Sequence, residues 1–135
     1  MQDKMMYILT KEKLSGFPIG PKKGERIFLR GDLGAGKTTL SKHIISTLLS
    51  TSIAVKSPTY TYYNRYEQNI YHFDLYRLHN YDDFVNIGGE EILDNPDNIC
   101  LIEWPEILEG RYKPTIDIQI LKTEKEDERK VYITV

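Results

Sequence analysis

The chain has 135 residues, of which 40% are hydrophobic and 28% charged, and its formal net charge is −2. These values are typical of one globular domain and exclude both a wholly disordered chain and a broad, charge-driven affinity for nucleic acid, so stable DNA binding is not expected. No apolar run approaches the roughly 18 residues of a membrane span, and the lone cysteine, Cys100, cannot form an intrachain disulfide, which favours a cytoplasmic protein.

The first third of the chain predicts two strands and a helix around a glycine-rich segment. Met5–Leu9 and Arg26–Leu29 read as short strands, and the first is too short for the apolar core of a signal peptide. The proline- and glycine-rich residues 11–24 leave room for at most a short helix. Beyond Gly31–Thr39, apolar residues fall at helical spacing: Leu40, Ile44, Ile45, Leu48 and Leu49.

A hairpin is predicted in the middle of the chain. Thr59–Tyr66 alternates in strand fashion, Gln68 and Asn69 offer a turn, and Ile70–Phe73 returns. Seven of the ten tyrosines of the chain fall between Tyr60 and Tyr81, in and just after this segment. Clustered tyrosines can stack on bases, but alternating tyrosines more often mark half-buried strands, which is the favoured interpretation.

The remaining elements complete an α/β pattern. Asn80 can cap a helix that continues to about Asn86 and is stopped by Gly88-Gly89. Ile99–Ile102 has the length and content of a strand buried on both faces. Two further strands, Ile116–Ile120 and Val131–Val135, pair across a turn. The order predicts a single small domain over residues 1–135, with a P-loop NTPase-like mixed β-sheet flanked by helices.

The glycine-rich segment fits the phosphate-binding pattern G-x-x-x-x-G-K-[ST]. Glycines let backbone N–H groups turn toward phosphate oxygens, and the following helix adds free N–H donors and its positive end. Lys37 is expected to contact the β/γ-phosphates and the Thr38 hydroxyl to bind Mg²⁺. The residues expected to line the phosphates are Leu33, Gly34, Ala35, Gly36, Lys37, Thr38 and Thr39.

Two carboxylates are candidates for the second half of a nucleotide site. Glu103 follows the buried strand and can bind Mg²⁺ or orient a water, while Asp74, at the end of another strand, is a rival for that duty. Taken alone, either carboxylate can equally be a residue at the end of a strand or in a turn, without a role in binding or catalysis. Trp104 can stack on a base or anchor the core. The N/T-K-x-D element of guanine recognition is missing, which favours adenine.

Four stretches in this order resemble the TsaE family, small ATPases of tRNA threonylcarbamoyladenosine biosynthesis. They are GDLGAGKTTL, SPTYTYYNRY, HFDLYRL and LIEWPE, beginning at Gly31, Ser57, His72 and Leu101. The first alone is generic, whereas the four together are specific. The resemblance covers about Ile27–Glu106 well and the C-terminal hairpin loosely.

The resemblance implies ATP and Mg²⁺ as cofactors, with Thr38 and Glu103 as metal ligands. It also implies that Asp74 is functionally important and that Thr59, in a switch-like Ser57-Pro58-Thr59 loop, faces the γ-phosphate, so that Lys37, Asp74 and Thr59 form the catalytic set. Trp104 and Glu106 would lie on the nucleotide side. In the family, a longer helix precedes the P-loop strand and borders the base. In this chain the segment is shorter, and Thr10 is the residue expected to contact the base.

By the same resemblance, the chain is expected to be a Mg-dependent ATPase, weak alone and stimulated by a partner. It would be an accessory factor for modification of tRNA position 37, acting on the TsaD–TsaB complex and reaching tRNA only through it. Slow hydrolysis fits the lack of an arginine finger in the P-loop region. Arg65, Arg77 and Arg111 are candidates for an internal substitute, although each is more often a surface or salt-bridge arginine. The alternatives are a small P-loop metabolite kinase and a nucleotide-sensing adaptor without turnover.

Overall fold

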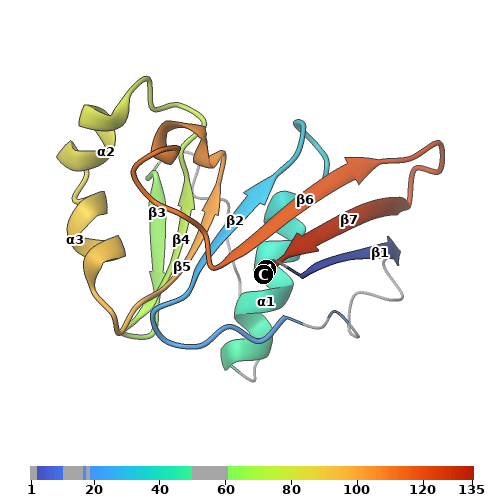
Figure 1. Ribbon diagram of the computed structural model, residues 1–135, viewed down its shortest axis with the longest axis horizontal. Coiled ribbons are helices and arrows are strands. Elements are labelled where there is room, and N and C mark those ends of the chain that lie inside the picture. The colour runs from blue at the N-terminus through green and yellow to red at the C-terminus, as the bar shows by residue number, and fades with distance from the viewer. Residues whose placement is uncertain (1–2, 11–16, 18, 50–60) are drawn as a thin grey trace.

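The computed structural model describes residues 3–10, 17, 19–49 and 61–135, and within them seven strands form one mixed sheet (Figure 1). The order across the sheet is β1-β7-β6-β2-β5-β4-β3. The strands are β1 (Lys4–Thr10), β2 (Arg26–Arg30), β3 (Tyr63–Tyr66), β4 (Ile70–Asp74), β5 (Ile99–Glu103), β6 (Ile116–Lys122) and β7 (Glu128–Thr134).

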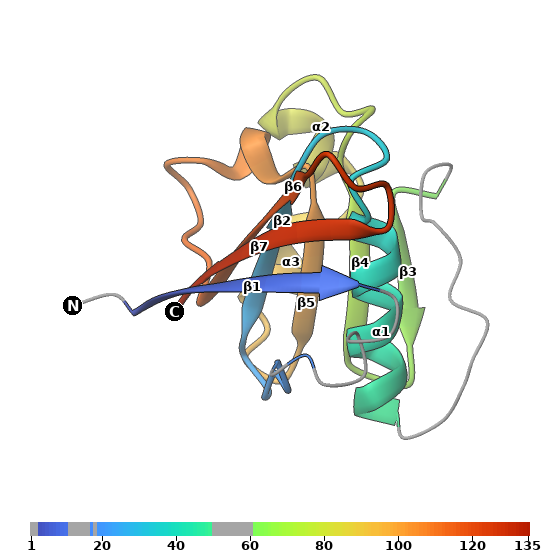
Figure 2. The same ribbon diagram turned by 90° about the vertical axis from the view of Figure 1, so that its right-hand side faces the viewer.

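The centre of the sheet is parallel and its margins are antiparallel. β2 pairs in parallel with β5 and β6, and β5 with β4, while β3–β4, β6–β7 and β1–β7 are antiparallel. Figure 2 shows β1 lying alongside β7, so that the start of β1 lies beside the end of β7. Every residue of β5 is buried, as the sequence predicted, because helices cover both faces of a parallel strand.

Two apolar cores lie on opposite faces of this sheet. Helix α1 (Lys37–Leu49) packs against one face, where Leu40, Ile44 and Ile45 meet the alternating isoleucines and leucines of β2, β5 and β6. Helices α2 (Tyr81–Asn86) and α3 (Gly89–Asp94) and the short 3₁₀ helix η2 (Pro105–Leu108) belong to the other face. No helix in the described part of the chain is long and apolar enough to cross a membrane.

The predicted α/β class, P-loop helix and hairpins are confirmed, with two local differences. β3 starts at Tyr63 rather than Thr59, because Tyr62 has φ 66°, which interrupts extended backbone; Thr59 itself lies outside the described residues. The tyrosines of this hairpin pack in the sheet, where Tyr63 lies 5.3 Å from Phe73, ring centre to ring centre.

The segment after Asn80 is more helical than predicted. The Asn80 side chain accepts a hydrogen bond from the Asp83 N–H (3.0 Å), so the predicted cap is confirmed. Gly88, with φ 84°, ends α2, but a second helix that the sequence analysis did not predict starts at Gly89. Gly89 faces the Phe84 ring so closely that a Cβ would lie 2.3 Å from it.

Candidate functional site

The glycine-rich segment forms a tight loop between β2 and α1. Gly34 (φ 75°) and Gly36 (φ 110°) occupy left-handed conformations that only glycine adopts without strain. The Ala35 N–H donates to the Asp32 carbonyl (3.0 Å), and α1 begins directly after Gly36. This geometry suits a loop whose N–H groups converge on an anion at a helix N-terminus.

A residue that the sequence analysis missed braces this loop from outside. The Arg129 guanidinium on β7 donates from Nε to the Ala35 carbonyl (2.8 Å) and from Nη2 to the Gly34 carbonyl (3.4 Å). The same group donates from Nη1 to the Glu126 carbonyl (2.7 Å). Its signal in the sequence is weak, because a lone arginine in a C-terminal hairpin matches no motif.

Lys37 is buried at the mouth of the loop, with 5% of its surface exposed. Its Nζ donates to the carbonyls of Gly31 and Asp32 and lies 3.9 Å from the centre of the Trp104 ring. Burial lowers the pKa of Lys37, an effect that nearby carboxylates, Glu103 first, partly oppose. A partly desolvated ammonium held by neutral carbonyls is well prepared to bind phosphate oxygens.

The predicted metal ligands lie in direct contact. The Thr38 hydroxyl is 3.0 and 3.1 Å from the two carboxylate oxygens of Glu103, which is 2% exposed. Glu103 also accepts a hydrogen bond from His72 Nε2. His72, a second residue that the sequence analysis did not single out, is fully buried.

Asp74 reaches the same edge of the sheet. It is in register with Glu103, because β4 and β5 are parallel and end together. Its Oδ1 accepts a hydrogen bond from the Tyr76 N–H (3.0 Å), and 8% of its surface is exposed. The carboxyl ends of adjacent parallel strands are where α/β sheets bind ligands.

An open cavity of about 310 Å³ lies over these groups. Its lining brings together most of the residues expected from the sequence: Leu33, Gly34, Ala35, Gly36, Lys37, Thr38, Thr39, Asp74, Glu103 and Trp104. Glu106 does not line it and is exposed on η2, although its charge acts on Lys37. The Trp104 ring packs on Tyr76, 4.8 Å away, and its backbone has φ 58°.

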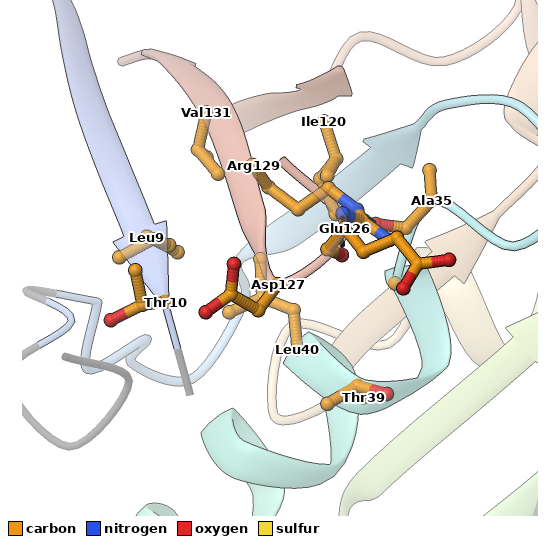
Figure 3. A pocket seen from close by; sticks show the side chains of 11 residues that line it. Leu9, Thr10, Ala35, Thr39, Leu40, Ile120, Glu126, Asp127, Arg129 and Val131 are labelled. Atoms are coloured by element: carbon orange, nitrogen blue, oxygen red, sulfur yellow. Dashed lines mark hydrogen bonds between the residues drawn. The ribbon is translucent and has the colours of Figure 1, made fainter. Parts of the chain in front are cut away.

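Thr10 lies on the opposite flank of the loop, in a second cavity of about 160 Å³ (Figure 3). The two cavities share Ala35, Gly36 and Thr39. The lining of the second cavity is mostly apolar, and Figure 3 shows that the polar side chains of Thr10, Glu126 and Asp127 also contribute. Its lining residues are Leu9, Thr10, Ala35, Gly36, Thr39, Leu40, Ile120, Glu126, Asp127, Arg129 and Val131.

Two of the arginines considered as internal fingers are engaged outside the first cavity. Arg65 donates to the Gln68 carbonyl within its hairpin, and Arg111 stacks on Tyr81. No arginine among the described residues lines that cavity. The switch-like Ser57-Pro58-Thr59 loop lies outside the described residues.

Comparison with known proteins decides the family. A family model described as threonylcarbamoyl adenosine biosynthesis protein TsaE matches residues 8–131. The chain belongs to the TsaE family. The relatives of this chain are named for the biosynthesis of threonylcarbamoyladenosine in tRNA.

The TsaE relatives and a solved structure agree with this assignment. A Haemophilus influenzae protein named tRNA threonylcarbamoyladenosine biosynthesis protein TsaE is 43% identical over 101 residues, which are 73% of this chain and 62% of that protein. A Bacillus subtilis protein of the same name is 37% identical over 117 residues, 84% of this chain and 71% of that one. The crystal structure of Bacillus subtilis YdiB matches with a TM-score of 0.71 at 25% identity, covering 100% of this chain and 87% of that one.

Proposed function

We propose that this TsaE-family protein is a Mg-dependent ATPase that acts as an accessory factor in threonylcarbamoyladenosine modification of tRNA position 37. The observation that carries the proposal is the contact between Thr38 and Glu103 beside Lys37, at the edge of the sheet where the P-loop begins. Family membership supplies the pathway.

The two cavities suit two parts of one nucleotide. The first would hold the phosphates, with the loop N–H groups and Lys37 as donors. The second cavity, which is mostly apolar, begins on the other side of the same loop and suits an adenine ring, with Thr10 in its lining. Trp104, which packs over Lys37, would then shield the phosphates rather than stack on the base.

The residues present fit a magnesium ion. Thr38 and Glu103 offer hard oxygen atoms at one point, and among the described residues no group of three or more acidic, histidine or cysteine side chains forms a separate metal site. Mg²⁺ commonly uses one or two protein ligands and completes its shell with phosphate oxygens and water. Bound there, it would neutralise negative charge on the β- and γ-phosphates.

Asp74 is the best placed general base or water-positioning group. It lines the phosphate cavity at the end of β4, in register with the proposed metal ligand Glu103 on β5. Thr59 would complete the γ-phosphate side, as the family resemblance implies. Since no described arginine lines the phosphate cavity, hydrolysis by the isolated protein should be slow.

The partner proposed from the resemblance is the TsaD–TsaB complex, with tRNA reached through it. Purified protein should release phosphate from ATP slowly, and the complex should accelerate the release. Transfer of the phosphoryl group to a metabolite would instead support a kinase, and tight ATP binding without any phosphate release would support a sensing adaptor. Either outcome would contradict the ATPase proposal.

A further inference from the structure

His72 lies where an apolar residue would be expected. On β4, Ile70, His72 and Asp74 point to the same face of the sheet, and Ile70 packs in the core beneath α1. His72 is in register with Leu101 of β5 and is 0% exposed. Burying an imidazole costs free energy unless its nitrogens have partners, so its presence calls for a specific contact.

That contact is Glu103. His72 Nε2 lies within hydrogen-bonding distance of Glu103 Oε2. In its proposed role as a metal ligand the carboxylate is an acceptor, so Nε2 is the donor in this contact. Nδ1 has no hydrogen-bond partner in the described part of the chain, so within it Glu103 is the hydrogen-bond partner of the His72 ring.

Two residues therefore contact the Glu103 carboxylate, one at the surface of the phosphate cavity and one within the core. Thr38 approaches from α1, at the surface of the phosphate cavity, and its hydroxyl oxygen is itself a proposed metal ligand. His72 approaches from the neighbouring strand within the core. The strands that carry His72 and Glu103 are paired directly, so the backbones of the two residues are held at a fixed separation.

We propose that His72 is a positioning residue that holds the Glu103 carboxylate in the orientation in which it binds Mg²⁺, an inference that rests on the proposed nucleotide function. A glutamate side chain with three free torsions would otherwise have to be ordered at the moment of metal binding. Loss of a hydrogen-bond partner behind a metal ligand typically lowers metal affinity or activity by about 10–100-fold.

Three substitutions separate this role from simple packing. His72→Gln keeps an N–H donor at about the reach of Nε2, whereas His72→Asn is equally polar but one methylene shorter. His72→Leu removes the donor and keeps the volume close. Ile70→Val is the matched control, because it is buried on the same face of the same strand and lines neither cavity.

The experiment measures binding of ADP with and without metal by calorimetry, and binding of Mn²⁺ to the ADP complex by electron paramagnetic resonance. Thermal melts of each variant select those that fold. For His72→Leu and His72→Asn, we expect Mn²⁺ affinity to fall about 10–100-fold, while ADP affinity in chelator stays within twofold of wild type. For His72→Gln, most of the Mn²⁺ affinity should return, and Ile70→Val should resemble wild type.

Unchanged Mn²⁺ affinity in a folded His72→Asn or His72→Leu protein would overturn the inference. So would a loss of ADP affinity in chelator that matches the loss with metal, or a His72→Gln variant no better than His72→Asn, because both indicate a packing role. The wild-type protein reports separately on the proposed function: if it binds no ADP at all, the nucleotide site itself fails.

Discussion

Lys37 carries its charge on a side chain that is almost entirely buried, although it lines an open cavity. Its Nζ contacts backbone carbonyls and the face of Trp104, and burial lowers its pKa. Such a cation gains more from phosphate oxygens than a lysine exposed to water does, because part of its desolvation has already occurred.

Replacing Lys37 with alanine should therefore remove most ATP affinity. Charge-assisted hydrogen bonds contribute about 1.5–3 kcal/mol each, so the dissociation constant measured by calorimetry should rise tenfold or more. Lys42→Ala is the control, since Lys42 is exposed on the same helix and lines neither cavity. Equal ATP affinity in wild type and Lys37→Ala would contradict the assignment of this loop as the phosphate-binding loop.

The two carboxylates at the edge of the sheet should have separable phenotypes. Glu103→Gln should weaken nucleotide binding only when Mg²⁺ is present, because it removes the charged ligand beside Thr38. Asp74→Asn should leave ATP affinity within a few-fold of wild type and abolish phosphate release. Binding titrations and single-turnover hydrolysis check the pair, and the reverse assignment of phenotypes would exchange the two roles.

Cys100 predicts a pH dependence of stability. Burial raises the pKa of its thiol to about 12, with Arg26 opposing the effect. From about pH 9, the unfolded thiol loses its proton while the folded thiol keeps it, so folding stability falls as pH rises through this range. The stability advantage of wild type over Cys100→Ala should then shrink by about 1.4 kcal/mol per pH unit. A difference in urea unfolding free energy that stays constant above pH 9 would contradict this.

At the scale of elements, the junction between α2 and α3 depends on the absence of a side chain at Gly89. A Cβ there would lie 2.3 Å from Phe84, which is fully buried in the core on that face of the sheet. Gly89→Ala should destabilise the protein by about 1–3 kcal/mol, the usual cost of overpacking. Gly20→Ala is the control, since a Cβ at Gly20 meets nothing within 4 Å. Equal urea midpoints for the two variants would contradict this prediction, because they would mean that α2 and α3 can move apart to accept the extra methyl group at no cost in stability.

Elements differ in how far their sequences determine them. The all-buried β5 and the apolar stripe of α1 were predictable, because burial on two faces or one imposes a local pattern. Helix α3 was not predicted, since a glycine pair normally ends a helix and the close packing of Gly89 on Phe84 is a tertiary contact. The late start of β3 likewise follows from the positive φ of Tyr62.

The site shows the same division. Lys37, Thr38 and Glu103 were predicted because motif chemistry and strand position are local properties of the sequence. Arg129 and His72 were missed, because their roles exist only through contacts with residues far away in the chain, Ala35 for the first and Glu103 for the second. A single sequence carries no pattern for such pairs.

At the scale of the whole molecule, one sheet connects the N-terminal strand, the P-loop and the C-terminal hairpin. β7 pairs with both β1 and β6, and its Arg129 braces the loop between the two cavities. The base and phosphate regions proposed here are thus built from both ends of the chain. A partner that contacts either region can influence nucleotide binding, and the nucleotide influences that partner by the same factor.

The most direct test of the proposed function is the threonylcarbamoyladenosine content of tRNA, measured by mass spectrometry. The host is a bacterium depleted of its own TsaE-family protein and supplied with this chain. We expect the wild-type chain to restore the modification, and equally expressed Lys37→Ala to fail while Lys42→Ala succeeds. Unmodified tRNA in the presence of well-expressed wild-type protein, or full modification with Lys37→Ala, would contradict the proposal that this chain supports the modification through its nucleotide site.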